Sequence, residues 1–162
     1  MIFVNRSWLC VVSTLHIIVV DKSDASLALA GKIGADHLVK ADGNEVEAVL
    51  ALTEGQGAEA VIDFVGERGT TTKGLAMTRP MGSYYVVGYG EDIRVPTVDM
   101  VITEKNIIGN LVGTWAELVE LMALADRGLV TLTTVEYRLA DANQALKDLH
   151  NGKIHGRAVL IP

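Results

Sequence analysis

The sequence HIIVVDKSDASLALAGKIGADHLVK, residues 16–40, has the pattern of a strand, a helix and a second short strand. The run His16–Val20 is dominated by Ile and Val, which is typical of a strand buried on both faces of a parallel sheet. Ser23 or Asp24 can cap the helix that follows, because either side-chain oxygen accepts a hydrogen bond from a free backbone N–H. Gly34 predicts the end of this helix. A strand, a helix and a strand in succession predict a parallel pair, since parallel strands need such a crossover.

The same alternation of short β-rich runs and longer amphipathic runs continues to the end of the chain. Further strands are predicted at His37–Val39, Ala60–Val65, Tyr84–Val87, Asn106–Val112, Val130–Leu139 and Arg157–Ile161. Further helices are predicted from Asn44 to the glycines at 55 and 57, and over Glu67–Met77, Trp115–Arg127 and Asp141–Leu149. This pattern predicts an α/β fold with right-handed crossovers, in which a mostly parallel, doubly wound sheet carries helices on both faces.

The composition limits the classes of function. A chain of 162 residues fits one domain, and a net charge of −6 without a Lys/Arg cluster argues against a nucleic-acid partner and against an anionic membrane surface. Cys10 is the only cysteine, which excludes an intrachain disulfide and a Cys-x-x-Cys pair, so we expect a reducing, cytoplasmic location. The apolar stretch Trp8–Val20 is shorter than the ~20 apolar residues that a membrane-spanning helix needs. We interpret it as containing a buried strand, with a signal peptide as the alternative.

Asp21 follows the first of the buried strands directly. Open parallel sheets bind their ligands beyond the carboxyl ends of the strands. A carboxylate at the end of the second strand of a dinucleotide-binding fold accepts both hydroxyls of the adenosine ribose and repels a 2′-phosphate, so it selects NAD over NADP. The alternative is an Asp that only stabilises the next helix through the helix dipole.

The glycine-rich loop that accompanies such an acid is missing. A G-x-G-x-x-G turn is expected about 20 residues before the acid, yet residues 1–30 contain no glycine. The standard pyrophosphate cradle therefore cannot be built from the same chain. In place of the first strand of the fold we expect a meander of Ile2–Val4, Leu9–Val12 and His16–Val20, with Asn5–Ser7 as one turn.

Other patterns give little support for catalysis. The histidines at positions 16, 37, 150 and 155 lack the His-x-x-x-His and His-Glu-x-x-His spacings of a helical metal site. Asp63 falls within a buried run, where an unpaired charge is costly, so we expect either that its face reaches solvent or that the carboxylate has a partner. The sequence therefore supplies no catalytic residue and no metal ligand.

Six segments carry a resemblance to a known family. They are VVDKSD (19–24), IGADHLVK (33–40), LTEGQGAEAVIDFVG (52–66), GSYYVVGYG (82–90), NIIGNLVGTWAELVEL (106–121) and NGKIHGRAVLIP (151–162). In this order they resemble the zinc-type, medium-chain alcohol dehydrogenases, in particular the NAD-dependent microbial members. The resemblance covers residues 16–162 and implies an incomplete Rossmann-like domain.

The resemblance also implies roles for individual residues. Asp21 matches the ribose-binding acid, and Lys22 matches the residue beside the adenine. The other matches are Phe64, Val65 and Gly66 in the turn after the fourth strand, Val87, Gly88 and Tyr89 along the nicotinamide ribose, Leu111 and Val112 at the backbone positions that hold the carboxamide, and Arg157 at a pyrophosphate-contacting arginine. A guanidinium suits that last role because it can pair two phosphate oxygens at once.

The chain also departs from the family. Residues 1–15 do not resemble it, residues 16–129 match a partial NAD-binding domain, and residues 130–162 match a tail that packs on a catalytic domain. That catalytic domain carries the zinc ligands and the proton relay, and no segment of this sequence matches it. We therefore expect a truncated portion of an alcohol dehydrogenase, without zinc-dependent catalysis of its own and with weak or lost NAD binding.

The unpartnered tail would expose apolar surface, and large apolar patches mark interfaces. We therefore expect a homo-oligomer, a dimer or a tetramer, and the resemblance places a family dimer contact near Ile93–Glu104. Two alternatives to an enzyme portion stay open. One is a non-catalytic module that binds nucleotide weakly, and the other is an oligomeric structural remnant without a ligand.

Overall fold

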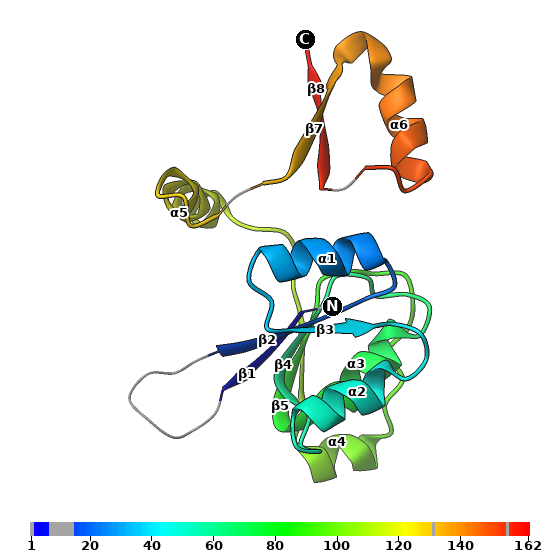
Figure 1. Cartoon of the computed structure of the whole chain (residues 1–162). Coiled ribbons are helices and arrows are strands. Elements are labelled where there is room, and N and C mark those ends of the chain that lie inside the picture. The colour runs from blue at the N-terminus through cyan, green and yellow to red at the C-terminus, as the bar shows by residue number, and fades with distance from the viewer. Residues whose placement is uncertain (1, 7–14, 131, 155) are drawn as a thin grey trace. The chain divides into compact units, whose positions relative to one another are not determined.

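The computed structural model describes residues 2–6, 15–130, 132–154 and 156–162, which belong to two compact units, Met1–Leu111 and Val112–Pro162 (Figure 1). The first unit contains, in chain order, β1 (Ile2–Arg6), β2 (Leu15–Asp21), α1 (Asp24–Lys32), β3 (His37–Lys40), α2 (Glu45–Leu52), β4 (Ala58–Asp63), α3 (Thr70–Met77), β5 (Thr78–Val86), α4 (Thr97–Thr103) and β6 (Asn106–Gly109). Its strands form one sheet in the order β3-β2-β1-β4-β5-β6. The predicted α/β class and the mostly parallel sheet are confirmed, since β2 pairs with β3, β4 with β5 and β5 with β6 in parallel.

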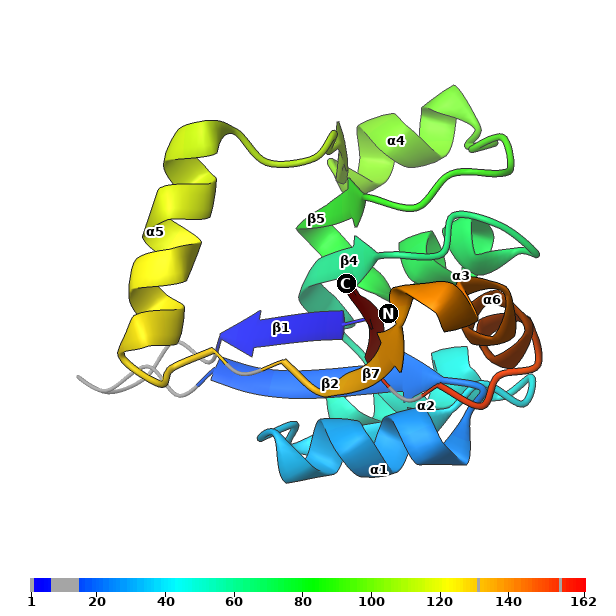
Figure 2. The ribbon, with the colours of Figure 1, turned by 90° about the horizontal axis from the view of Figure 1, so that it is seen from above.

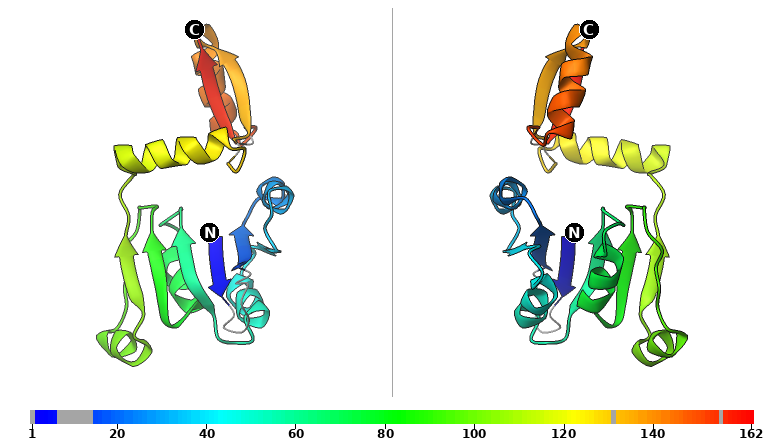
Figure 3. Two further views of the ribbon diagram at one scale, coloured as in Figure 1. Left: turned by 90° about the vertical axis from the view of Figure 1, so that its left-hand side faces the viewer. Right: turned by 90° about the vertical axis from the view of Figure 1, so that its right-hand side faces the viewer.

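The strand in the middle of this sheet is reversed. β1 pairs antiparallel with β2 on one side and with β4 on the other, as Figures 2 and 3 show. Its residues Asn5 and Arg6 pair with His16 and Leu15, so the predicted turn at Asn5–Ser7 is wrong. The backbone of Asn5 and Arg6 stays extended because it continues the pairing with β2, whereas β4 pairs only with Ile2–Val4. The Leu9–Val12 strand of the predicted meander lies outside the described residues.

The helix after β2 begins and ends as its sequence predicts. The Ser23 hydroxyl accepts a hydrogen bond from the N–H of Ser26 at 3.3 Å, so Ser23 is the N-cap of α1. Asp24 in the first turn and Lys32 in the last turn carry the charges that the helix dipole favours. Gly34 follows at a φ of 107°, a left-handed conformation that ends the helix at low cost for glycine.

The two faces of the sheet are covered differently. On one face, Val49 of α2 and Met77 of α3 pack with the strand residues Ile18, Val61 and Tyr84 into a core that is at most 1 % exposed at each of these positions. On the opposite face, α1 covers β3, because a Cβ on Gly31 would lie 3.2 Å from the Leu38 side chain. The register places Tyr85 and Ile108 on this second face, where Ile108 remains 37 % exposed. Helices on both faces are thus confirmed, and the completely buried residues Ile18 of β2, Val61 of β4 and Tyr84 of β5 lie on the α2/α3 face.

Two elements differ from the pattern in the sequence. β5 begins at Thr78 rather than at Tyr84, because its start pairs with Ala58 before the register shifts around Met81, which has a φ of 61°. The helix α4 has no counterpart among the predicted elements. Its apolar side chains are mostly exposed, and its seven residues are too few to show a helical period clearly in the sequence.

The second unit contains α5 (Trp115–Asp126), β7 (Thr134–Arg138), the short helix η1 (Leu139–Asp141), α6 (Ala142–His150) and β8 (Arg157–Ile161). β7 and β8 form a parallel pair, and α6 packs against both. Thr114 and Glu117 cap α5 reciprocally, and Gly128 follows its end, as the predicted helix requires. Asp141 stands at the N-cap of α6, but its carboxylate pairs with Arg138 at 2.8 Å instead of capping the helix. The predicted boundary at residue 130 stays a prediction.

Candidate nucleotide-binding edge

The parallel strands of the first unit end along one edge of the sheet. β2 ends at Asp21, β4 at Asp63, β5 at Val86 and β6 at Gly109. The strand order β3-β2-β1-β4-β5-β6 places the change in winding direction between β2 and β4. Ligands of open α/β sheets bind beyond the carboxyl ends of the strands at such a point.

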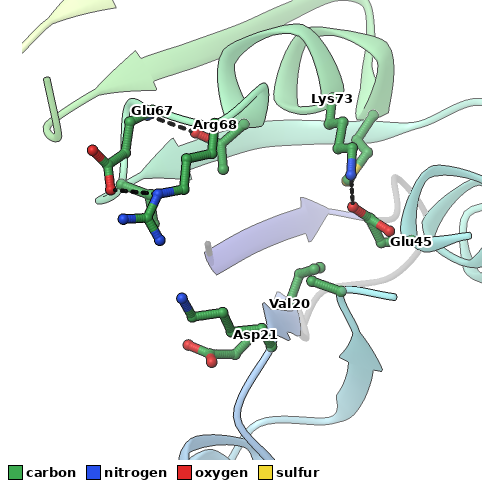
Figure 4. Close-up of a pocket in the computed structure, with 11 residues that line it drawn as sticks. Val20, Asp21, Glu45, Glu67, Arg68 and Lys73 are labelled. Atoms are coloured by element: carbon green, nitrogen blue, oxygen red, sulfur yellow. Dashed lines mark hydrogen bonds and ion pairs between the residues drawn. The ribbon is translucent and has the colours of Figure 1, made fainter. Parts of the chain in front are cut away.

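A pocket of about 270 Å³ lies at this edge, between the segment after β2 and the segment after β4 (Figure 4). Its apolar lining comes from Val20, Ala41, Val65 and Met77. Its polar lining comes from Asp21, Lys22, Glu45, Glu67, Arg68, Thr70 and Lys73, so it contains three carboxylates and three cations. An apolar floor with a charged rim suits a flat heterocycle joined to a polar sugar.

Asp21 is the acid of this pocket that the sequence predicts as a ribose ligand. One carboxylate oxygen, Oδ1, accepts the N–H of Ser23 at 2.7 Å, which fixes the side chain at the start of α1. Its Oδ2 has no hydrogen-bond partner within the described chain, and the residue is half-buried. In Figure 4, Asp21 lies on the opposite side of the pocket from Glu67 and Arg68. The carboxylate is therefore oriented and still able to accept hydrogen bonds from a ligand.

Glu45 and Lys73 form an ion pair between α2 and α3 in the wall of the pocket. Glu45 is only 3 % exposed, and it also accepts the N–H of Gly43 at 2.7 Å. Burial acts to raise the pKa of the Glu45 carboxyl, but the hydrogen bonds from Lys73 and from backbone N–H groups outweigh it and hold the pKa below its usual value. Glu45 therefore stays ionised and ties the two helices together.

The loop after β5 is tied to the start of α3 by a second carboxylate. Glu91 accepts hydrogen bonds from the N–H of Gly69 at 2.7 Å, from the N–H of Thr71 at 3.0 Å and from the Thr71 hydroxyl at 2.6 Å. The hydroxyl of Thr71 and the two backbone groups lower the pKa of Glu91. This contact fixes the helix start beside Thr70, which lines the pocket.

The structure brings together several, but not all, of the residues predicted to contact a cofactor. Asp21, Lys22 and Val65 line one pocket. Gly66 and Gly88 lie backbone to backbone, since a Cβ on Gly66 would be 2.2 Å from the carbonyl oxygen of Gly88. The β4 and β5 segments therefore meet at this edge.

Several of the other predicted residues form an exposed apolar rim after the strands. Phe64 is 54 % exposed, Val87 38 %, Tyr89 93 % and Leu111 87 %. Val112 and Arg157 belong to the second unit. Their predicted roles at the nicotinamide and the pyrophosphate stay predictions.

The polar residues of the pocket beyond Asp21 and Lys22 were not found from the sequence. Glu67, Arg68, Thr70 and Lys73 follow β4 directly, so the rule that ligands bind after parallel strands could have found them. Glu45 follows the end of β3 and carries the same signal, but its pairing with Lys73 depends on the packing of α2 against α3 and could not be read from the sequence.

Comparison with known proteins agrees with this fold. The sequence profile described as "Zinc-binding dehydrogenase" matches residues 9–127. The chain belongs to the zinc-binding dehydrogenase family. It is 34 % identical over 154 residues to an NAD-dependent alcohol dehydrogenase of Sulfurisphaera tokodaii, covering 93 % of this chain and 44 % of the relative. It is 32 % identical over 154 residues to an NAD-dependent alcohol dehydrogenase of Saccharolobus solfataricus, with the same two coverages.

Among solved structures, the alcohol dehydrogenase of Aeropyrum pernix superposes with a TM-score of 0.85 at 39 % identity, over 90 % of this chain and 42 % of that chain. This zinc-binding dehydrogenase chain thus spans less than half the length of the relatives that it matches. It corresponds to the C-terminal, nucleotide-binding portion of the family, as its sequence predicts.

The described residues of this zinc-binding dehydrogenase do not fit a zinc centre. In the ranges that the structure describes, no group of three or more His, Cys, Asp or Glu residues is placed to hold a metal ion. Zinc needs three or four such ligands. No helix among the same residues is long and apolar enough to cross a membrane.

In the part of the chain that the structure describes, the central strand supplies no loop to this edge. β1 occupies the middle of the sheet but runs opposite to its neighbours, so the connection from β1 to β2 leaves from the far edge. A loop and helix N-terminus that bind pyrophosphate must instead leave the carboxyl edge. Among the described residues, the segments that do leave this edge follow β2, β4, β5 and β6, and β1 contributes none.

Proposed function

We propose that this chain is the NAD-binding portion of an alcohol dehydrogenase and that its pocket binds the adenosine half of NAD. The observation that carries the proposal is the oriented Asp21 carboxylate, whose Oδ2 is available beside a pocket of about 270 Å³ at the carboxyl edge of the sheet. The names of the two relatives above, both NAD-dependent alcohol dehydrogenases, support the choice of cofactor.

Each part of the pocket has a chemical role in this proposal. Asp21 accepts hydrogen bonds from the 2′- and 3′-hydroxyls of the ribose, and its charge disfavours the 2′-phosphate of NADP. Val65 and Met77 contact the adenine, and the Lys22 ammonium lies beside it. The exposed rim from Phe64 to Tyr89 faces the nicotinamide half. When bound, NAD supplies a hydride acceptor.

Binding by this chain alone is proposed to be weak. A complete cradle donates several backbone hydrogen bonds to the pyrophosphate, and each charge-assisted bond contributes about 1.5–3 kcal/mol. Their absence lowers the affinity by orders of magnitude. Alcohol oxidation is proposed to require a second polypeptide that supplies the zinc ligands and the proton relay. The described residues contain no group of three or more His, Cys, Asp or Glu placed to hold a metal ion, and no segment of the sequence matches the catalytic domain. We retain the cytoplasm as the proposed location.

The experiment compares Asp21→Asn with the matched control Asp126→Asn, which makes the same change at an exposed position of α5. NADH and NADPH are titrated while protein fluorescence is measured. We expect Asp21→Asn to weaken NADH binding about tenfold and to narrow the NADH/NADPH preference, since one charged hydrogen-bond acceptor is lost. The control keeps wild-type affinities. Identical titrations for Asp21→Asn and wild type, or no NADH binding by wild type at millimolar concentration, would contradict the proposal.

Self-association is the second part of the proposed function. In α4, Val98 is 58 % exposed, Val101 76 % and Ile102 73 %, which is unusual for three aliphatic side chains on one short helix. This helix lies within the segment that the sequence predicts as a dimer contact. Sedimentation of the wild type is expected to show a dimer or a larger oligomer, and Val101→Glu is expected to shift it toward monomer. A clean wild-type monomer at high concentration would remove the idea, as would a Val101→Glu oligomer of unchanged size.

A further inference from the structure

Two loops of the nucleotide-binding edge converge on one buried carboxylate. Asp63, the last residue of β4, is 0 % exposed. Its Oδ1 accepts the N–H of Val65 at 2.8 Å and the N–H of Gly66 at 3.1 Å. Its backbone carbonyl accepts the N–H groups of Val87 and Gly88, both at 2.9 Å. One residue thus holds the start of both segments that are predicted to face the cofactor.

The second carboxylate oxygen of Asp63 is held by Tyr84 from the neighbouring strand. The Tyr84 hydroxyl donates to Oδ2 at 2.7 Å, and Tyr84 is itself 0 % exposed. The ring is confined by α3, because a Cβ on Gly74 would lie 2.5 Å from Tyr84 Cε2. Burial, together with the Asp63 charge, raises the pKa of Tyr84, so the phenol stays protonated and remains a donor.

No Lys or Arg pairs with Asp63 in the described part of the chain. A buried carboxylate is costly unless hydrogen bonds satisfy it. Here the donors are the Tyr84 hydroxyl and the two loop N–H groups. An apolar side chain of the same shape would avoid that desolvation cost, so packing alone does not account for an acid at this position.

The two loops are also coupled directly to each other. A Cβ on Gly88 would lie 2.3 Å from the carbonyl carbon of Val65, and the N–H of Glu91 donates to the Gly66 carbonyl at 3.0 Å. At such close backbone contact, a displacement of one loop displaces the other.

We propose that Asp63 is the positioning residue of the nucleotide-binding edge, where its carboxylate, held by Tyr84, keeps the segments Phe64–Gly66 and Val87–Tyr89 in the geometry that receives the dinucleotide. Asp63 acts through these loops, because it is completely covered and does not line the pocket. This inference rests on the proposed function for its effect on affinity, whereas its effect on the loops can be measured without a ligand.

The test uses two variants. Asp63→Leu removes both carboxylate acceptors at similar side-chain size. Asp63→Asn keeps one oxygen that accepts from the loop N–H groups, and its amide N–H can donate to the Tyr84 hydroxyl oxygen. Hydrogen exchange is followed by NMR at the amides of Val65 and Gly66, with the amide of Val39 in β3 as the internal reference. We expect exchange at the two loop amides to become about tenfold faster in Asp63→Leu, which corresponds to the loss of about one hydrogen bond. Val39 keeps its rate, and Asp63→Asn restores most of the loop protection.

Affinity is measured on the same variants with NADH as the probe. Binding is expected to weaken about tenfold in Asp63→Leu and to recover in Asp63→Asn, in parallel with the exchange rates. If the wild type binds no NADH, the proposed function fails, while the exchange data still decide whether Asp63 positions the loops. Unchanged loop exchange would overturn the inference, and so would an equal acceleration at Val39, which would mean a general loss of stability.

A second pair of variants applies if Asp63→Leu does not fold. Tyr84→Phe keeps the buried ring and removes the hydroxyl, whereas Tyr85→Phe makes the same change on the opposite face of β5. Tyr84→Phe is expected to speed exchange at Val65 and Gly66 about threefold, because Asp63 then loses one of its donors. Tyr85→Phe is expected to leave these rates unchanged. Equal rates in the two variants would contradict the role of Tyr84 and Asp63 together.

Discussion

β1 and β2 lie side by side in the same sheet, yet only β2 delivers a functional group to the carboxyl edge. β2 ends there with Asp21, whose orientation the following helix fixes. β1 runs the other way, so its last residue, Arg6, pairs with Leu15 at the opposite edge. A gap in a sheet can be filled by backbone hydrogen bonds in either direction. A ligand site at the carboxyl edge depends on strand direction, because the loop after each strand must leave from that shared edge to contact the ligand.

The comparison predicts, first, that β1 is essential for stability despite its reversed direction. Val4 pairs with Ile17 on one side and with Ala60 on the other. Val4→Pro removes an N–H from the centre of the sheet and is expected to lower the free energy of unfolding by about 3 kcal/mol or more. Leu38→Pro, in the edge strand β3, is the control with the smaller expected loss. Urea unfolding measures both, and equal losses would mean that β1 is not an integral central strand.

The second prediction concerns the direction of the first strand. Replacing residues 1–15 by a parallel strand, a G-x-G-x-x-G loop and a helix restores a loop at the carboxyl edge. We expect NADH to bind about 100-fold more tightly, because the loop N–H groups contact the pyrophosphate. Adenosine is expected to bind as before, since it carries no phosphate. Calorimetry with both ligands provides the measurement, and an equal gain for adenosine would show that the chimera only repaired the fold.

The third prediction concerns the wall of the pocket beside the end of β2. Glu45→Gln is expected to cost about 1–3 kcal/mol of stability near pH 7, because a hydrogen-bonded charge is lost from the Lys73 pair. Since the folded-state pKa of Glu45 lies below its unfolded value, this stabilisation is present above the unfolded pKa and disappears as the pH falls through the folded one. The variant should therefore lose less stability than wild type on acidification below about pH 4.5. Glu47→Gln, at an exposed position of the same helix, should keep the wild-type acid profile.

The smallest expected effect is at the cap that orients the segment after Asp21. Ser23→Ala removes the hydroxyl that accepts the hydrogen bond from the Ser26 N–H, and it is expected to lower the free energy of unfolding by about 1 kcal/mol. Ser26→Ala, one turn into the same helix, is the control and should change stability by only a few tenths of a kcal/mol. Thermal unfolding compares the two, and equal shifts would mean that Ser23 does not act as a cap.

Local patterns in the sequence predicted most elements of this fold. The apolar run before Asp21, the cap at Ser23 and the stop at Gly34 each depend on neighbouring residues, so they could be recognised without the fold. The α4 helix was missed although Val98, Val101 and Ile102 have helical spacing, because its seven residues are fewer than the window of about 11–18 residues over which such a period is recognised. The turn at Asn5–Ser7 was wrong because β1 extends through Asn5 and Arg6 to pair with β2, while its other edge pairs with β4, far along the chain.

For the site, the sequence by itself determined Asp21 at the end of its strand and the absence of a glycine-rich loop before residue 31. A residue type at the end of a recognisable strand is a local property, and so is a missing glycine. Only the tertiary structure decided the direction of β1, the pairing of Glu45 with Lys73 and the convergence of two loops on Asp63. Each of these depends on which segments become neighbours, and the burial of apolar surface and the satisfaction of backbone hydrogen bonds settle that over the whole chain at once.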